Sequence, residues 1–157
     1  MVNNSPFDLI QFLSALLTPA IALITTYIAI QQYRLNKFNT RKELYDRRLG
    51  VYQATMSFLA IILGSANAPR DASATFLKET SLSHFLFKKD IPEYLETIYK
   101  KANDLYSTHT KMQADRERLK GNEWEKLVDR NSDLFEWFAD KFEVTKEKFM
   151  PYLSLKD

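Results

Sequence analysis

Hydrophobic and polar positions divide the chain into one unbroken apolar stretch and a longer part whose apolar residues recur with helical spacing. The stretch from Leu9 to Ile30 contains no charged residue. As a helix that rises about 1.5 Å per residue, it reaches about 33 Å, which is enough to cross a hydrocarbon core of about 30 Å. The pattern predicts one transmembrane helix, with residues 1–32 as the membrane part and 33–157 as a cytosolic helical domain.

One stripe of the predicted transmembrane helix is small or polar, whereas its other faces carry Leu, Ile and Phe. The members of this seam follow one another at spacings of three and four residues: Gln11, Ser14, Thr18, Ala22, Thr25 and Ala29. Helices in lipid associate through close packing of small residues and through hydrogen bonds, so the seam predicts self-association. Chance is the alternative, because such residues are common in membrane helices. Pro19 removes one backbone hydrogen bond and predicts a kink.

Residues 31–63 contain no proline and a single glycine, which predicts that the helix continues without a break beyond the membrane segment. Gly64 and the Ser, Asn and Pro residues that follow predict its end. We expect an unbroken helix to transmit movement of the domain into the membrane. Its expected apolar face consists of Phe38, Tyr45, Leu49, Tyr52, Met56, Leu59 and Leu63.

Two further segments carry helical signals. Residues 72–87 predict a short helix followed by a hydrophobic connection. Asp90 is expected to cap the next helix, with Glu93 completing a capping box, and that helix is expected to end at Lys120 with Gly121 as its C-terminal cap. Its expected apolar face consists of Ile91, Leu95, Ile98, Ala102, Leu105, His109 and Met112.

The last helix is expected to be capped by Asn122 and stopped by Pro151, with Tyr152 docking back on the core. A break at 131–133 is an alternative. Its expected apolar face consists of Trp124, Leu127, Leu134, Phe138, Phe142 and Phe149. The whole chain has only three glycines and five prolines, which is little turn material for a β fold. The prediction is therefore an all-α protein whose transmembrane helix continues into a cytosolic bundle of about four helices.

Positive charge is concentrated in the first half of the predicted domain. All 22 Lys and Arg residues follow residue 30; residues 31–89 hold ten basic and four acidic residues (+6), and 90–157 hold twelve and fifteen (−3). The positive-inside rule places this side in the cytoplasm and the N-terminus outside, in the bacterial inner membrane. The clustering suits anionic lipid headgroups or a polyanionic ligand, and a solvated surface that only sets topology is an equal alternative.

The sequence offers little catalytic chemistry. There is no cysteine, which excludes disulfides, thiolate metal sites and cysteine nucleophiles. The two histidines, His84 and His109, do not have helical metal-ligand spacing, and no HExxH, GxSxG or Gly-rich phosphate loop occurs. We therefore expect no enzyme activity, no cofactor and no metal site.

The sequence offers more side chains suited to ligand binding, because tyrosines lie among its basic residues. Guanidinium and ammonium groups match phosphates, and aromatic rings offer stacking faces for bases. The same side chains also serve as interhelical salt bridges or lie in solvent in many proteins. No duplex-reading motif is visible, so duplex nucleic acid is not an expected partner. The candidate ligand-binding residues are Arg41, Lys42, Arg47, Arg48, Lys88, Lys89, Tyr99, Lys100 and Lys101.

Residues 43–52 read ELYDRRLGVY, and 85–87, 91–95 and 149–153 read FLF, IPEYL and FMPYL. With these motifs the chain resembles, over nearly its whole length, small bacterial single-pass membrane proteins with a juxtamembrane helix. It also resembles the membrane effectors of type III CRISPR antiviral defence, in which a cytosolic domain senses cyclic oligoadenylate. The resemblance implies a homo-oligomer, such as a tetramer, that binds a cyclic nucleotide and perturbs the membrane without enzyme activity.

Three functions are open at this point. The leading hypothesis is an oligomeric membrane effector of antiviral defence, whose partners are membrane lipid, further copies of the chain and a cyclic oligonucleotide. The rival is a non-enzymatic membrane-anchored scaffold that recruits a protein partner through its helical surface. The third is a regulator that acts on lipid surfaces through its basic half.

Overall fold

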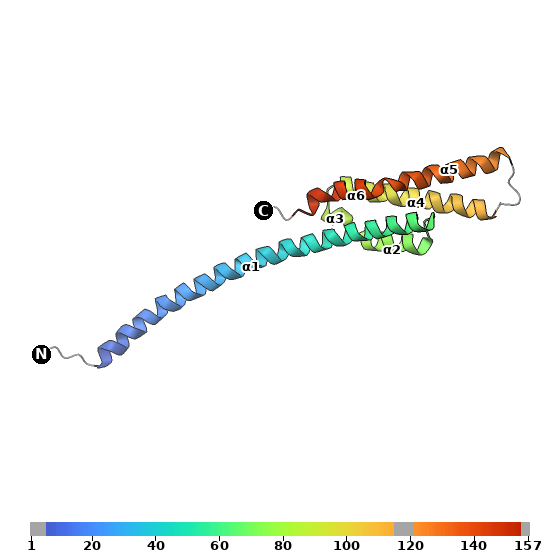
Figure 1. The fold of residues 1–157 in the computed structure, drawn as a ribbon. Helices are drawn as coiled ribbons and strands as arrows, with labels where there is room; N and C mark the ends of the chain where they lie inside the picture. Colours follow the sequence, from blue (N-terminus) through green and yellow to red (C-terminus); the bar gives the residue numbers. More distant parts are fainter. Residues whose placement is uncertain (1–5, 115–120, 155–157) are drawn as a thin grey trace. The chain divides into compact units, whose positions relative to one another are not determined.

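The computed structural model describes residues 6–114 and 121–154, and the chain forms two compact units, Met1–Glu43 and Leu44–Asp157. Every element in the described residues is a helix (Figure 1), which confirms the all-α prediction. The units meet after Glu43, whereas the predicted boundary at residue 32 marks the end of the membrane segment. The boundary after Glu43 marks where the chain begins to pack on other helices, whereas the predicted boundary at residue 32 marks where the uncharged stretch ends.

Helix α1 runs from Pro6 to Ser65 with Pro19 inside it, so the prediction of an unbroken helix is confirmed. In the first unit, every described side chain of α1 is exposed. Among the described residues, α1 is the one helix long and apolar enough to cross a membrane. Its exposed large hydrophobic side chains in this unit are Leu16, Leu17, Ile21, Leu23, Ile24, Tyr27, Ile28, Ile30, Tyr33, Leu35 and Phe38.

In the second unit, α1 buries a face that differs from the predicted one. The buried residues are Val51, Ala54, Thr55, Phe58, Leu59 and Ile62. Phe38 is exposed, and of the predicted face only Leu59 is fully buried, while Tyr45, Leu49, Tyr52, Met56 and Leu63 are half-buried. Phe58 stacks on Phe76 with ring centroids 4.5 Å apart, and Tyr52 meets Phe149 at 5.6 Å. Phe76 and Phe149 come from different helices that pack on two sides of α1, so the most buried residues of α1 lie between these two contacts.

The end of α1 is fixed by local polar contacts. The Ser65 hydroxyl donates to the Ile61 carbonyl at 2.7 Å, and Asn67 Oδ1 accepts the Ala68 N–H at 2.8 Å. The residue with left-handed backbone is Ala66, at φ 50°, while Gly64 lies inside the helix. The predicted end of the helix is therefore confirmed, although the strained turn residue is not the glycine.

Two short helices follow, α2 from Arg70 to Thr80 and α3 from Ser83 to Leu86. This arrangement confirms the prediction of a short helix and a hydrophobic connection over 72–87, and the connection itself contains α3. Phe76 from α2 is buried against Phe58.

Helix α4 runs from Asp90 to Ala114. Its predicted apolar face is confirmed: Ile91, Leu95, Ile98, Ala102 and Leu105 are buried, and His109 and Met112 are half-buried. The predicted capping box is wrong, because the Glu93 N–H donates to the Lys89 carbonyl at 3.1 Å and the Asp90 carboxylate accepts the Tyr152 hydroxyl at 2.7 Å. The predicted helix end at Lys120 lies outside the described residues.

Helix α5 runs from Asn122 to Ala139, α6 from Lys141 to Phe149, and the 3-10 helix η1 from Met150 to Tyr152. Gly121 precedes α5 as its cap, so the prediction that Asn122 is the cap is wrong. The polar residues at 131–133 continue the helix because Ser132 and Asp133 point to solvent.

The helix is interrupted at Asp140 instead, so the last predicted helix becomes two. The described part of the second unit contains the end of α1, the helices α2 to α6 and η1, where a bundle of about four helices was predicted. The Tyr152 ring lies 5.2 Å from that of Phe87, which confirms that the C-terminal segment docks on the core.

Candidate functional site

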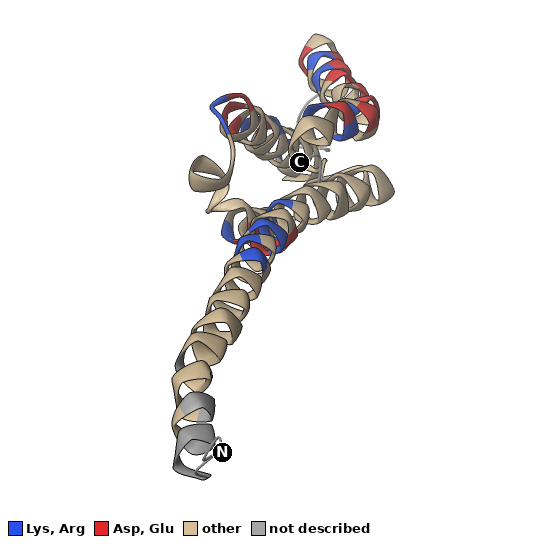
Figure 2. Ribbon diagram, turned by 90° about the vertical axis from the view of Figure 1, so that its left-hand side faces the viewer, with Lys and Arg blue, Asp and Glu red and all other residues tan. Residues whose placement is uncertain are grey.

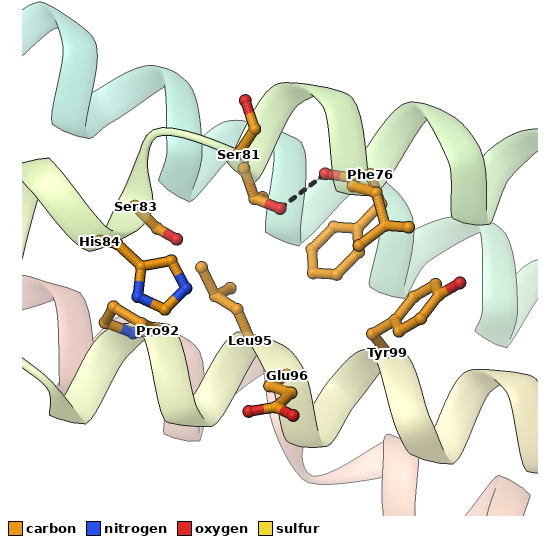
Figure 3. A pocket seen from close by; sticks show the side chains of 10 residues that line it. Phe76, Ser81, Ser83, His84, Pro92, Leu95, Glu96 and Tyr99 are labelled. Carbon is orange, nitrogen blue, oxygen red and sulfur yellow. Dashed lines mark hydrogen bonds between the residues drawn. The ribbon is translucent and has the colours of Figure 1, made fainter.

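A groove between α2 and α4 contains two adjoining hollows that share Leu77 and Tyr99. The first, of about 300 Å³, also meets α3 (Figure 3). Its wall includes the buried Phe76, and the Thr80 hydroxyl on the same helix donates back to the Phe76 carbonyl at 2.7 Å. His84 enters from α3 and lies beside Pro92 of α4 in Figure 3. This end of the groove is small and largely apolar.

Glu96 gives the first hollow a negative group. Lys100 lies 2.7 Å from the Glu96 carboxylate, and this hydrogen bond and charge lower the pKa of Glu96, with a smaller contribution from the charge of His84. Both partners of the ion pair are exposed, so it adds little to stability. The ion pair occupies the Lys100 ammonium with a carboxylate one turn earlier on the same helix, α4.

The second hollow, of about 660 Å³, has a different chemistry. Arg70 begins α2, and its guanidinium carbon lies 5.2 Å from the ring centroid of Tyr106 on α4. No carboxylate is among the described residues that line it, whereas Arg70 and Lys111 supply two positive groups. The remaining lining is Ser73, Ala74, Leu77, Tyr99, Asn103, Tyr106, Ser107 and Thr110.

This second hollow, called here the cationic groove, suits an anionic ligand with a flat ring. Guanidinium and ammonium groups bind phosphate oxygens, tyrosine rings stack on bases, and an Asn side chain offers both a donor and an acceptor to a base edge. Tyr99, Asn103, Tyr106 and Thr110 follow one another at spacings of four, three and four residues, which places them on one face of α4.

The predicted ligand-binding residues are distributed over several places. Arg41 and Lys42 belong to the first unit, and the other seven belong to the second. Lys88 is exposed, and Lys89, directly before α4, lies 3.8 Å from Glu93 of α4. Of the nine predicted residues, Tyr99 is the one that lines the cationic groove.

Two of the remaining predicted residues have neighbours elsewhere in the second unit. The Lys101 ammonium lies 5.8 Å from the Trp137 ring centroid, against α5. Arg47 borders a separate hollow of about 430 Å³ between α1 and the α2–α3 segment, together with Glu79, Leu82 and Leu86.

Arg48 joins three parts of the second unit. Its Nε donates to the Leu86 carbonyl at 2.9 Å, and its Nη1 lies 3.5 Å from the Tyr152 carbonyl. Its guanidinium also lies near the rings of Phe87 and Tyr152, 5.8 and 5.6 Å from their centroids. This basic residue therefore holds α1, the end of α3 and η1 together.

The predicted seam lies on the exposed part of α1. Its described members Gln11, Ser14, Ala22, Thr25 and Ala29 are all exposed, and the side chain of Thr18 lies outside the described residues. The Thr25 hydroxyl is 2.9 Å from the Ile21 carbonyl and 3.0 Å from that of Ala22, so its hydrogen bond stays within its own helix.

Sequence reasoning missed Arg70, Asn103 and Lys111 as possible ligand-binding residues. The signal for Asn103 was the helical spacing from Tyr99 to Thr110. No local signal pointed to Arg70, because only the packing of α2 on α4 brings it next to Tyr106. Among the described residues there is no group of three His, Asp or Glu side chains that could hold a metal ion.

Comparison of the chain with protein-family models, curated proteins and solved structures found no match. The proposals below therefore rest on the two units, the cationic groove and the sequence motifs.

Proposed function

We propose that this protein is an oligomeric membrane effector of bacterial antiviral defence, which α1 anchors in the inner membrane and which a cyclic oligoadenylate activates. The observation that carries the proposal is the combination within one chain of an exposed apolar helix and a packed unit with a cationic, tyrosine-lined groove. The described side chains of 14–17 and 19–40 are all exposed, and a lipid bilayer is the surrounding that covers an apolar helix on every side.

The cationic groove is the proposed ligand site. Arg70 and Lys111 hold phosphates, and Tyr99 and Tyr106 stack on adenine rings, with Asn103 placed for the base edge. One subunit offers one such groove, so a ring of repeated nucleotides matches an assembly that repeats the groove around an axis. The ligand shifts the assembly toward its active state only by its difference in affinity for the two states.

Ligand binding is tested with the full chain in lipid nanodiscs and labelled cyclic tetra-adenylate, with other ring sizes and linear oligoadenylate alongside. We expect binding that Arg70→Ala and Lys111→Ala each weaken by about tenfold or more, the value of a charge-assisted hydrogen bond. Lys78→Ala, on the exposed side of α2, is the matched control and keeps wild-type affinity. Arg70→Lys separates charge from a folding effect, since it keeps the positive group. If no ring size binds at micromolar protein, the proposal that a cyclic oligoadenylate is the ligand is wrong.

Orientation is tested with single cysteines, because the chain has none of its own. A cysteine in place of Asn4 should react with an impermeant maleimide in spheroplasts, and one in place of Lys126 should react only after permeabilisation. The reverse pattern contradicts the proposed topology, and equal labelling of both contradicts insertion. Capture of a single stoichiometric protein partner, together with no response to nucleotides, favours a membrane-anchored scaffold instead.

The proposed seam is tested by replacing Ser14, Thr18 and Thr25 with leucine. These changes keep the helix apolar, so anchoring should be unaffected while crosslinking between copies and toxicity to the cell fall. If crosslinking and toxicity survive, α1 is an anchor and takes no part in assembly.

A further inference from the structure

The corner of the second unit at α3 exposes apolar side chains that a water-soluble surface does not usually show together. Phe85 is 86% exposed, more than Leu23 of the apolar part of α1 at 73%. Leu82 is 48% exposed and Met150, at the start of η1, is 59% exposed. Figure 1 shows α3 and the red end of the ribbon, to which η1 belongs, at the same end of this unit.

This exposure comes from a well-fixed segment. The Phe85 N–H donates to the Leu82 carbonyl at 3.0 Å and the Phe87 N–H to that of Ser83 at 3.0 Å, which closes α3 as a tight turn. Arg48 holds the Leu86 carbonyl, and the Phe87 ring packs edge-on against Phe149 at 5.3 Å. The neighbours of Phe85 are therefore held in place while Phe85 itself points away from the core.

Lysines and carboxylates both border these apolar side chains, and the lysines lie within the segment itself. Residues 81–89 contain Lys88 and Lys89 and no acidic residue. Of the neighbouring carboxylates, Glu79 lines a hollow with Leu82 and Arg47, Asp90 accepts the Tyr152 hydroxyl, and Glu93 lies 3.8 Å from Lys89 in an exposed pair. Figure 2 shows further blue residues on α1, the element to which Arg47 and Arg48 belong. An apolar tip bordered by lysines is complementary to anionic phospholipid headgroups over acyl chains.

The chain also keeps this corner close to the proposed bilayer. Arg48, which holds the corner, follows Ile30 by 18 residues (48 − 30). Even fully extended, 18 residues span at most about 60 Å, and as a helix they span about 27 Å. The length of this segment therefore limits how far the corner can lie from the proposed bilayer, and docking requires α1 to slant toward the membrane surface after Ile30.

We propose that the corner patch, made of Leu82, Phe85, Lys88, Lys89 and Met150, is a second membrane contact that docks on the anionic lipid of the leaflet that α1 crosses. This inference rests on the proposed insertion of α1. The aromatic and thioether side chains enter the boundary between headgroups and acyl chains, and the lysines meet lipid phosphates. The contact fixes the second unit against the bilayer, and the unit moves only when the contact is released.

The test uses spin labels on single cysteines in the full chain, at one copy per nanodisc so that a second copy cannot cover the patch. Labels at 85 and 150 should be more accessible to oxygen than to a polar nickel complex in discs that contain anionic lipid. A label at 128, replacing Val128 of α5 with its 39% exposed side chain, is the matched control and should report water. A label at 23 reports the insertion of α1 itself.

Three outcomes separate the two proposals. Lipid contact at 23, 85 and 150 supports both. Lipid contact at 23 with water at 85 and 150 overturns the corner contact and leaves insertion standing. Water at 23 overturns insertion, and the corner proposal falls with it.

Charge is tested separately with Lys88→Gln and Lys89→Gln, read through the label at 150. We expect the ratio of docked to free corner to fall by about fivefold for each lysine removed, and to fall likewise when the anionic lipid is replaced by a neutral one. Lys126→Gln on α5 should leave the ratio unchanged. Docking that is indifferent to these lysines and to lipid charge contradicts the proposed recognition of anionic lipid.

Discussion

The two parts of α1 have similar apolar residues and opposite surroundings. In the first unit its large hydrophobic side chains are exposed, with Leu23 at 73% and Ile24 at 59%, whereas in the second unit Phe58 is 2% exposed and Ile62 is fully buried. Thr25 bonds to carbonyls of its own helix, while Thr145 in the second unit reaches the Tyr94 hydroxyl of another helix at 2.8 Å. The difference shows that apolar content alone does not decide whether other helices of the chain cover a helix face.

The largest effect is expected from cutting a side chain in the packed part of α1. Phe58→Ala removes a fully buried ring that stacks on Phe76, and should destabilise the second unit by about 3–5 kcal/mol. Leu23→Ala, in the exposed part of the same helix, should change that stability by less than about 0.5 kcal/mol. Denaturant unfolding followed by the fluorescence of Trp124 and Trp137 measures both. Equal losses would remove the distinction between the two parts.

A charge placed in the exposed part should show what covers it. Ile24→Arg should oppose membrane insertion by about 2.5–3.5 kcal/mol, since an arginine then sits near the centre of the bilayer. Extraction by alkaline carbonate should release more of this variant than of the wild type. Val128→Arg, an exposed position of α5, should leave extraction unchanged. If Ile24→Arg stays as firmly in the membrane fraction as the wild type, the first unit is not a membrane segment.

Arg48 lies near the start of the packed part of α1, and its guanidinium N–H groups should contribute to the stability of the second unit. Arg48→Ala should cost about 2 kcal/mol in the free energy of unfolding, because the Leu86 carbonyl loses a charge-assisted hydrogen bond. Arg48→Lys should recover less than half of this loss, since one ammonium cannot replace a planar guanidinium that lies near two rings and donates to a backbone carbonyl. The control is Lys126→Ala, with an unchanged unfolding midpoint. Full recovery by lysine would mean that charge alone matters at this position.

The packed unit should also respond to alkaline pH through a buried hydroxyl. Burial raises the pKa of Tyr94 above its ordinary value of 10.0, against a smaller lowering by the hydrogen bond with Thr145. A raised pKa in the folded state gives stability that is complete below the pKa of the unfolded chain and is lost as pH rises above it. Tyr94→Phe should cost about 1–2 kcal/mol at pH 7, because Thr145 loses its partner, and the gap to the wild type should narrow above about pH 10. A gap that is constant through alkaline pH would contradict this account.

The smallest effect is expected at the end of the packed part. Ala66 adopts φ 50°, a conformation that costs an alanine roughly 1 kcal/mol, so Ala66→Gly should stabilise by about 0.5–1 kcal/mol. Gly64→Ala should stabilise by a similar amount, because a Cβ added there meets no atom within 4 Å and alanine favours a helix. Thermal unfolding of the two single variants and the double variant checks both values. Destabilisation by Ala66→Gly would show that the turn is held by something other than local backbone preference.

Much of the candidate site could not be read from the sequence. Tyr99 was predicted as a ligand-binding residue among basic ones, and Tyr106 follows it by seven residues, a spacing that places both on one helix face. Arg70 is 36 residues from Tyr106 (106 − 70), and only the packing of α2 on α4 brings the two together. Arg48 was predicted to bind a ligand, and the fold engages its guanidinium with backbone carbonyls and two rings.

The sequence by itself determined the helical class, the unbroken course of α1 through Ser65 and the apolar face of α4. These features follow from local propensity and from periodicity within one element, which neighbouring residues carry in full. Only the tertiary structure decided which face of α1 is buried, that the last helix is interrupted at Asp140, and that Asp90 accepts the Tyr152 hydroxyl instead of capping the helix. Each of these depends on partners far away in the chain, whose positions no local pattern records.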